Sequence, residues 1–236
     1  MSNLKTLIIP AVHENLGALD ACEPLIEKAE RVVVMGNLFD TPTDDNHFVA
    51  GMCTWLLEHV KQRKFTFLYG PHDAHYAFKH EWFKAEGYST RTQHLVDTYL
   101  TLNDFANWKL WTKVGNYLVS HAGFCPETQR LISPDAHNQA LKVALAGGFH
   151  PLWMPGECSG GPPKAIGGPL WLDWGVEFKP LLDLDRNPIN QIVSHTPHED
   201  GKVHMRGRNY SINTGFKYVL FVDGDVVTVL PVEVER

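Results

Sequence analysis

Five short polar segments follow apolar runs of the chain, and four of them carry histidine. They are Ala11-Val12-His13, Gly36-Asn37-Leu38-Phe39-Asp40, Gly70-Pro71-His72-Asp73, Ser120-His121-Ala122-Gly123 and Ser194-His195-Thr196-Pro197-His198. Imidazole nitrogens bind transition metals and exchange protons near neutral pH, and a neighbouring carboxylate can orient the ring. A single such histidine is more often structural, but several of them in succession indicate one chemical site.

The apolar runs before these segments predict the strands that position them. Runs at 4–12, 31–35 and 65–69 alternate with helical patterns at 16–29 and 44–61, which predicts parallel strands joined by helices. The carboxyl ends of such strands converge on one crevice, so the five segments could line a single site. These segments are called the strand-end segments below.

The rest of the chain predicts a second set of strands. We expect a helical, aromatic region at 75–106, a strand pair at 109–114 and 116–121, and a helix at 126–146. Short strands are predicted at 189–194, 202–206, 210–213, 218–222 and 226–234, with a hairpin turn at 223–225. The pattern therefore indicates an antiparallel sheet packed beside a parallel one, with helices outside, in a single domain over 1–236.

Composition excludes several classes of protein. The 236 residues carry a formal charge of −6, which argues against a protein that holds nucleic acid mainly by neutralising phosphates. A small basic stripe on one strand face is predicted from Lys202, His204, Arg206 and Arg208. The four cysteines are widely spaced, and no segment reads as a signal peptide or a membrane span, so we expect a cytoplasmic protein with reduced thiols and no membrane contact.

A long segment at about 147–168 is rich in glycine and proline and predicts a surface loop. Trp153 lies within it, and Trp171 and Trp174 follow it. We expect Trp171 and Trp174 to cap the core, whereas exposed tryptophans beside the crevice would favour a partner surface.

The order and spacing of the strand-end segments resemble the calcineurin-like metallophosphoesterases, whose motifs have the form DxH, GDxxD, GNH(D/E), H and GH. The phrases VSHAGF, SHTPHEDGKV and SINTGF are most similar to the bacterial and phage protein-phosphatase branch of that family. The resemblance spans Ile8 to about Gly215. It implies an α/β fold in which two mixed β-sheets form an αββα sandwich flanked by helices.

The resemblance also implies a two-metal centre, with metal-ligand positions at His13, Asn37, His121 and His195. Here the chain departs from the family, because Ala11 and Pro71 stand where the family has an aspartate and an asparagine. Asn37 replaces the bridging aspartate. Hard divalent cations prefer carboxylate oxygens, and a neutral amide bridges two cations poorly, so we expect a vestigial or weak metal site.

Some of the family's machinery is retained. Asp40 and His72 match the aspartate and histidine pair that protonates the leaving group, although the pair could equally brace two strand ends. Thr41 stands where the related branch has a phosphate-binding arginine, and Glu14 replaces a glycine. The surviving imidazoles, with His75 or His198 nearby, could hold one weakly bound Zn²⁺ or Mn²⁺, or could become cationic below about pH 6.5 and hold a phosphate.

These substitutions predict an inactive pseudophosphatase that binds a protein or a phosphorylated ligand. The first alternative is an active hydrolase that uses one metal or a relocated carboxylate, with Glu14, Asp40 and Asp73 as candidates. The second alternative is a phage structural or host-takeover protein, which would act in the cytoplasm of a bacterial host.

Overall fold

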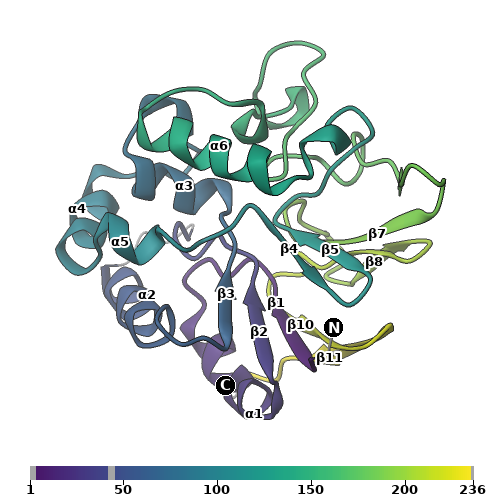
Figure 1. The fold of residues 1–236 in the computed structure, drawn as a ribbon. Coiled ribbons are helices and arrows are strands. Elements are labelled where there is room, and N and C mark those ends of the chain that lie inside the picture. The colour runs from purple at the N-terminus through teal and green to yellow at the C-terminus, as the bar shows by residue number, and fades with distance from the viewer. Residues whose placement is uncertain (1–3, 42–45, 235–236) are drawn as a thin grey trace.

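The computed structural model describes residues 4–41 and 46–234, which form two stacked β-sheets (Figure 1). The first sheet has the strand order β11-β10-β1-β2-β3. Strands β1 (Thr6–Ile9), β2 (Arg31–Val34) and β3 (Phe65–Phe67) are parallel, as predicted. Strands β10 (Tyr218–Asp223) and β11 (Val226–Pro231) form an antiparallel hairpin beside β1, with the predicted turn at 223–225.

The second sheet has the order β4-β5-β7-β9-β8, and β6 (Leu181–Leu182) pairs with the beginning of β7. Its central strands β5 (Tyr117–Ser120), β7 (Pro188–Val193) and β9 (Asn209–Ser211) are parallel to one another. The outer strands β4 (Trp111–Val114) and β8 (His204–Arg206) are antiparallel to their neighbours.

The pattern-based expectation of one parallel and one antiparallel sheet is therefore wrong, whereas the two mixed sheets implied by the family resemblance are confirmed. The physical reason is the path of the chain. It leaves the first sheet after β3, builds the second, and returns as the β10–β11 hairpin on the free edge of β1. Local patterns identify strands but do not specify which edge a returning strand will join.

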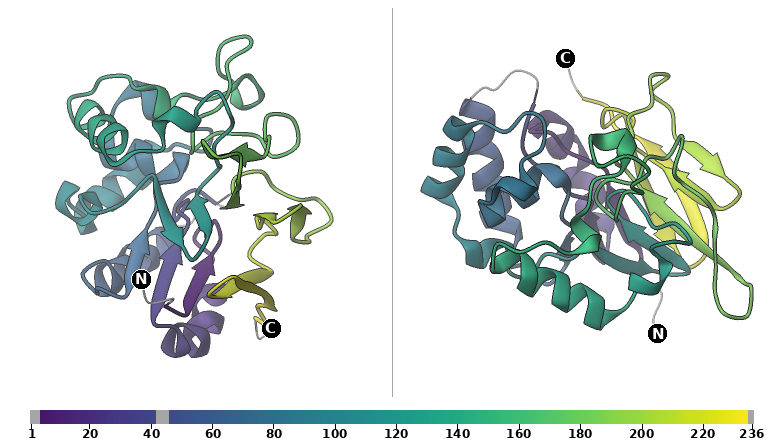
Figure 2. Two further views of the ribbon diagram at one scale, coloured as in Figure 1. Left: turned by 45° about the vertical axis from the view of Figure 1, so that its right-hand side comes forward. Right: turned by 90° about the horizontal axis from the view of Figure 1, so that it is seen from above.

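Helices cover the first sheet and the upper end of the molecule (Figures 1 and 2). They are α1 (Leu16–Lys28), α2 (Asn46–His59), α3 (Pro71–Phe78), α4 (Thr90–Tyr99), α5 (Leu102–Phe105) and α6 (Pro134–Leu145). Short 3₁₀ turns lie at Glu81–Phe83, Gln129–Leu131, Pro151–Trp153 and Glu157–Ser159. The predicted start of the second helix, at 44, lies outside the described residues. No described helix has the length and apolarity needed to cross a bilayer.

The core has two main layers, one on each face of the first sheet, and this explains why β2 contains three consecutive valines. Val32 and Val34 pack on the helical side of the first sheet, and Val33 packs between the two sheets. Val119 and Ile192, which belong to the second sheet, pack in the same layer as Val33. A strand buried on both faces needs apolar side chains at every position, and this burial keeps the strand ends rigid.

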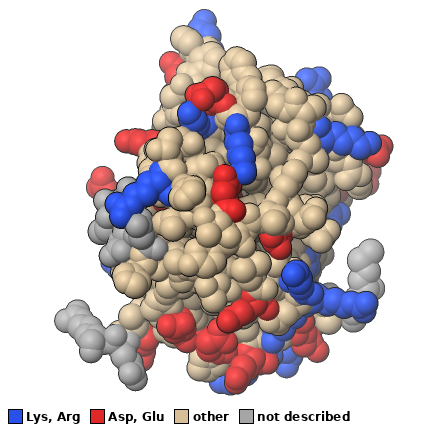
Figure 3. Space-filling model, turned by 90° about the vertical axis from the view of Figure 1, so that its left-hand side faces the viewer, with Lys and Arg blue, Asp and Glu red and all other residues tan. Residues whose placement is uncertain are grey.

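The glycine- and proline-rich segment at 147–168 is anchored to the core through its tryptophan. Trp153 is buried, and its Nε1 donates a hydrogen bond to the Ala140 carbonyl at 3.0 Å. Of the two tryptophans expected to cap the core, Trp174 is buried, whereas Trp171 is only partly buried. Trp82, which the sequence analysis did not single out, is 66% exposed. On the helical face, acidic and basic side chains are both present, without a large basic patch (Figure 3).

Candidate functional site

The strand-end segments converge at the carboxyl ends of β1, β2, β3, β5 and β7. The rings of His13 and His72 lie 5.3 Å apart, and those of His121 and His195 also lie 5.3 Å apart. Asn37 Nδ2 lies 3.5 Å from His13 Nε2. His13, His72, His121 and His195 are called the imidazole cluster below. The structure thus brings Asn37 and the four imidazoles near one another, while their chemical roles stay a prediction.

Several residues in this region have a backbone conformation that favours glycine. The φ angles are +48° at His13, +58° at Glu14, +48° at Asn37 and +65° at Asp40. Such conformations cost about 1–3 kcal/mol each and persist only where surrounding contacts enforce them. The strain is concentrated in the two loops that present the site's side chains.

Asp73 is one of the contacts that enforce this conformation. It is fully buried, and its Oδ2 accepts hydrogen bonds from the N–H groups of Asn37 at 2.6 Å and Gly70 at 2.9 Å. Its Oδ1 accepts the N–H of Leu38 at 2.8 Å. Burial raises the pKa of Asp73 to about 7, although these donors act in the opposite direction. Asp73 therefore joins the loop after β2 to the loop after β3 and faces away from any ligand.

Asp40 is surrounded by side-chain donors from α3. Its Oδ2 lies 2.8 Å from His72 Nδ1 and 3.1 Å from His75 Nε2, and its Oδ1 accepts the Tyr76 hydroxyl. Burial would raise the pKa of Asp40, but hydrogen bonds from His72, His75 and Tyr76 outweigh burial and hold that pKa below its usual value. The carboxylate thus stays ionised and directs Nε2 of the partly exposed His72 outward.

His121 and His195 form a direct imidazole pair. His121 Nδ1 lies 2.7 Å from the Met35 carbonyl, so Nδ1 carries the proton and Nε2 keeps its lone pair. His195 Nδ1 lies 3.3 Å from that Nε2 and donates its proton to it. Burial lowers the pKa of His121 well below its usual value and that of His195 to about 4. Both rings are neutral at pH 7.

These residues do not fit the two-metal centre that the fold family implies. Within 4–41 and 46–234, no group of three or more histidine, cysteine, aspartate or glutamate side chains is arranged to hold a metal ion. Ala11 presents only a buried methyl group, and its N–H donates to Ser194 Oγ at 2.8 Å. Pro71 is the first residue of α3 and supplies no donor atom. Asn37 Oδ1 accepts the N–H of His72 at 3.2 Å.

Glu14, a candidate for a relocated carboxylate, is engaged by the backbone of the loop after β2. Its side chain is buried, and Oε1 accepts the N–H of Asp40 at 3.0 Å. Glu14 therefore ties the loop after β1 to the loop after β2. Asp73 is likewise engaged by backbone donors, so these two of the three candidate carboxylates hold the loops in place.

The idea that the cluster becomes cationic below about pH 6.5 is wrong for its buried members. Burial lowers the pKa of His13, and the neighbouring His72 lowers it further. The same two causes lower the pKa of His195. An anion bound beside His121 and His195 at pH 6 would meet neutral rings rather than imidazolium ions.

Two further sequence expectations change in the structure. His198 lies outside the imidazole cluster, where it stacks on His204 with 3.8 Å between ring centroids and contacts Ser211 Oγ at 2.8 Å. The predicted basic stripe is divided by a turn at Gly207, where φ is +62°. Arg206 packs over Trp174, whereas Arg208 turns toward Tyr117.

Two aromatic contacts in the site were not assigned a role from the sequence. Tyr76 bonds Asp40, and its position four residues after His72 on α3 could have indicated a shared helical face. Trp171, which is partly exposed, places its ring edge-on to His195 with 5.8 Å between centroids. No local signal predicts that contact, because it depends on how the long loop folds back.

Comparisons with known proteins agree on the fold. No protein-family model and no curated protein sequence matches the chain. A cold-active protein-tyrosine phosphatase from a psychrophilic Shewanella superposes with a TM-score of 0.60 at 13% identity, covering 98% of this chain and 80% of that one. A protein serine/threonine phosphatase from Saccharomyces cerevisiae gives a TM-score of 0.57 at 15% identity, covering 100% and 82%. The chain therefore shares the fold of these two phosphatases.

Proposed function

We propose that this chain is a pseudophosphatase, which keeps the phosphatase fold and binds a protein or a phosphorylated ligand without two-metal hydrolysis. One observation carries the proposal: His121 Nε2 and His195 Nδ1 are hydrogen-bonded to each other, and within the described residues they belong to no group of three or more side chains arranged to hold a metal ion. Ala11 and Pro71 supply no oxygen donor in their side chains, and Asn37 offers a neutral amide where hard cations prefer a carboxylate. The expected location of this activity is the cytoplasm.

The retained Asp40–His72 pair is consistent with the binding of a phosphorylated ligand. His72 Nε2 is directed outward from a carboxylate that holds the other ring nitrogen. A phosphoester oxygen could accept a hydrogen bond from Nε2 of a protonated His72, whose side chain is 20% exposed. The site lacks the arginine of the related branch, because Thr41 follows Asp40. We therefore expect weak phosphate binding unless a partner surface adds contacts.

One observation favours a second candidate, a hydrolase that works with a single zinc ion. Two nitrogens bound to one tetrahedral Zn²⁺ at about 2.0–2.1 Å lie about 3.3–3.4 Å apart. His121 Nε2 and His195 Nδ1 lie 3.3 Å apart. The Met35 carbonyl holds the other ring nitrogen of His121, which is how the orientation of metal-binding histidines is commonly fixed. Only two such nitrogens are present, so we expect any zinc site to be weak.

Metal stoichiometry separates the two candidates. Protein purified without chelator is loaded separately with Mn²⁺ and Zn²⁺, desalted and measured by elemental analysis, and hydrolysis of p-nitrophenyl phosphate is followed on the same samples. The pseudophosphatase proposal expects no retained metal and no turnover. One zinc per chain that is lost in His121→Ala, with turnover lost in His72→Ala, would establish the single-metal hydrolase instead.

A further inference from the structure

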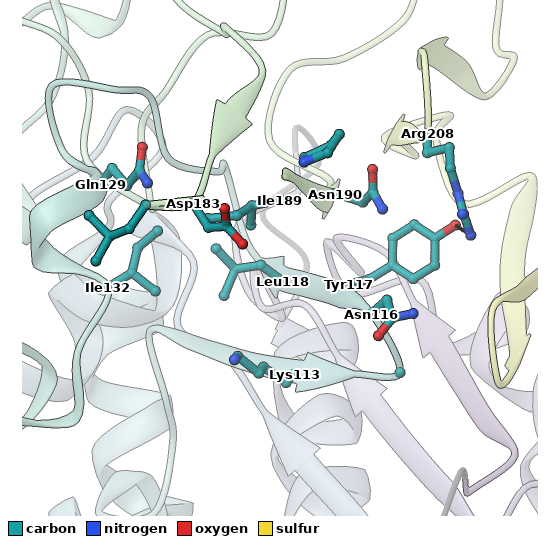
Figure 4. A pocket seen from close by; sticks show the side chains of 13 residues that line it. Lys113, Asn116, Tyr117, Leu118, Gln129, Ile132, Asp183, Ile189, Asn190 and Arg208 are labelled. Carbon is teal, nitrogen blue, oxygen red and sulfur yellow. Dashed lines mark hydrogen bonds between the residues drawn. The ribbon is translucent and has the colours of Figure 1, made fainter. Parts of the chain in front are cut away.

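A groove of about 690 Å³ crosses the second sheet away from the imidazole cluster (Figure 4). Its lining draws on β4, β5 and β7 and on the turns around Gln129 and Asp183, and it includes no residue of the strand-end segments. Leu118, Ile132 and Ile189 form an apolar surface on one side. The volume lies within the range of about 300–1,000 Å³ typical of small-molecule sites.

The charged groups of the groove are unbalanced. Three lining residues are charged, namely Lys113, Asp183 and Arg208. Both oxygens of the Asp183 carboxylate accept hydrogen bonds from Asn187 in the same turn. Oδ1 accepts the backbone N–H of Asn187 at 2.8 Å, and Oδ2 accepts the side-chain N–H of Asn187 at 3.1 Å. Lys113 and Arg208 form no ion pair among the residues the structure describes. The groove therefore offers two cations in a protein of net charge −6.

Arg208 is held in place while part of its guanidinium stays available. Nη2 donates to the Asp225 carbonyl at 3.2 Å and lies 3.5 Å from the Tyr117 hydroxyl. Neither Nε nor Nη1 has a hydrogen-bond acceptor within the described chain. A guanidinium fixed on one side presents its remaining N–H groups in a geometry suited to a carboxylate or phosphate.

Asn190 supplies a second unsatisfied donor. Only 9% of this residue is exposed, and its carboxamide makes no hydrogen bond within 4–41 and 46–234. Figure 4 shows the carboxamide beside Tyr117 and Arg208 at one end of the groove. The carboxamide borders the groove and is not among the enclosed polar atoms without a partner, so its N–H groups can donate to a ligand there in place of water.

We propose that this groove binds a small organic anion with a carboxylate or phosphate head group and an apolar body. The head group contacts Arg208 and Asn190, and the body lies on Leu118, Ile132 and Ile189. Lys113 lies on the apolar side, where its charge adds long-range attraction for the anion. The inference is independent of the proposed function, because it involves none of the imidazoles.

Nuclear magnetic resonance titration of the whole chain tests the site. The probes are 4-phenylbutyrate and phenyl phosphate, with 4-phenylbutanol as the neutral analogue and inorganic phosphate as the bare head group. We expect shifts in the Asn190 side-chain amide and in the Leu118 and Ile189 methyl groups for at least one anionic probe. Arg208→Gln should weaken that probe's binding by about tenfold or more, because a charge-assisted pair is lost.

Arg91→Gln is the matched control, since Arg91 is exposed on α4 and does not line the groove. It should leave binding unchanged, and both variants should keep the parent's melting temperature. Asn190→Ala gives a second variant that removes the amide. Binding of phenyl phosphate alone would assign a phosphate head group, and binding of 4-phenylbutyrate alone a carboxylate. Equal affinity for 4-phenylbutanol, no effect of Arg208→Gln, or shifts confined to His72 and His195 would overturn the proposal.

Discussion

The carboxylate of Asp73 accepts the backbone N–H of Leu38 at 2.8 Å, which joins the start of α3 to the loop after β2. Asp73→Asn should lower the free energy of unfolding by about 1–3 kcal/mol, because an amide nitrogen would face one of three buried N–H donors. Urea denaturation measures the loss. The exposed Asp20 on α1 gives the control, and Asp20→Asn should change stability by less than about 0.5 kcal/mol.

Acidification should destabilise the protein through its buried imidazoles. The pKa of His195 is about 4 in the folded state, because of burial and the neighbouring His72, and about 6.5 in an unfolded chain. Between these values the unfolded chain binds more protons, so the free energy of unfolding falls as the pH is lowered from about 6.5 to about 4. Chemical denaturation at several pH values in this window measures the slope.

His195→Gln is the informative comparison for that slope. The variant should lose less stability between pH 6.5 and pH 4 than the parent, because one depressed pKa is gone. Asp73 has the opposite effect on stability. Burial raises its pKa to about 7, so its contribution to the free energy of unfolding falls as the pH rises from about 4 to 7. Since Asp73 is present in both proteins, the difference between them isolates His195, and equal slopes would contradict its assigned pKa shift.

Glu14 occupies a strained conformation that glycine would relieve, yet Glu14→Gly should be destabilising. The substitution removes about 1 kcal/mol of strain at φ +58°. It also leaves the Asp40 N–H without its buried acceptor, which costs about 1–3 kcal/mol. Thermal unfolding of Glu14→Gly should therefore begin at a lower temperature than that of the parent.

Lys164 provides the matched case for that substitution. Its φ is +62°, its side chain is exposed, and its backbone N–H bonds Glu157 Oε2 whatever the side chain. Lys164→Gly should leave stability unchanged or raise it by up to about 1 kcal/mol. If Glu14→Gly were equally neutral, the bond from Asp40 to Glu14 would carry no net stabilisation.

Trp153, within the long loop, and Trp82, beside it, should respond differently to truncation. Trp153→Ala removes a buried ring and its bond to Ala140, and should cost about 3–5 kcal/mol. Trp82→Ala removes a largely exposed ring and should change stability by less than about 0.5 kcal/mol. Equilibrium unfolding followed by far-ultraviolet circular dichroism compares the variants without relying on tryptophan fluorescence.

The strand-end segments could be predicted from sequence because two local signals coincide there. A run such as Val32, Val33 and Val34 marks a buried strand, and the polar residues after it mark the strand's end. Parallel strands then place such ends together without any knowledge of side-chain contacts. This is why His13, Asn37, His72 and His195 were placed in one site correctly.

The electrostatic state of that site was beyond the reach of sequence. Whether His195 is cationic at pH 6 depends on how deeply the ring is enclosed, and Trp171 reaches it from a loop of irregular structure. Glu14 likewise has a carboxylate whose direction is set by a positive φ that no residue pattern indicates. Such features arise from long-range packing, which local propensity does not encode.

Restoring the missing ligands tests how far the site has diverged. In the triple variant Ala11→Asp, Asn37→Asp and Pro71→Asn, two new carboxylates face the imidazole cluster in buried positions, so we expect the metal-free protein to be less stable than the parent. Saturating Mn²⁺ should then raise the variant's melting temperature, because an ion that binds only the folded state stabilises it. The parent should show no such rise. A variant that gains neither stability nor retained metal would show that substitutions beyond these three positions prevent metal binding.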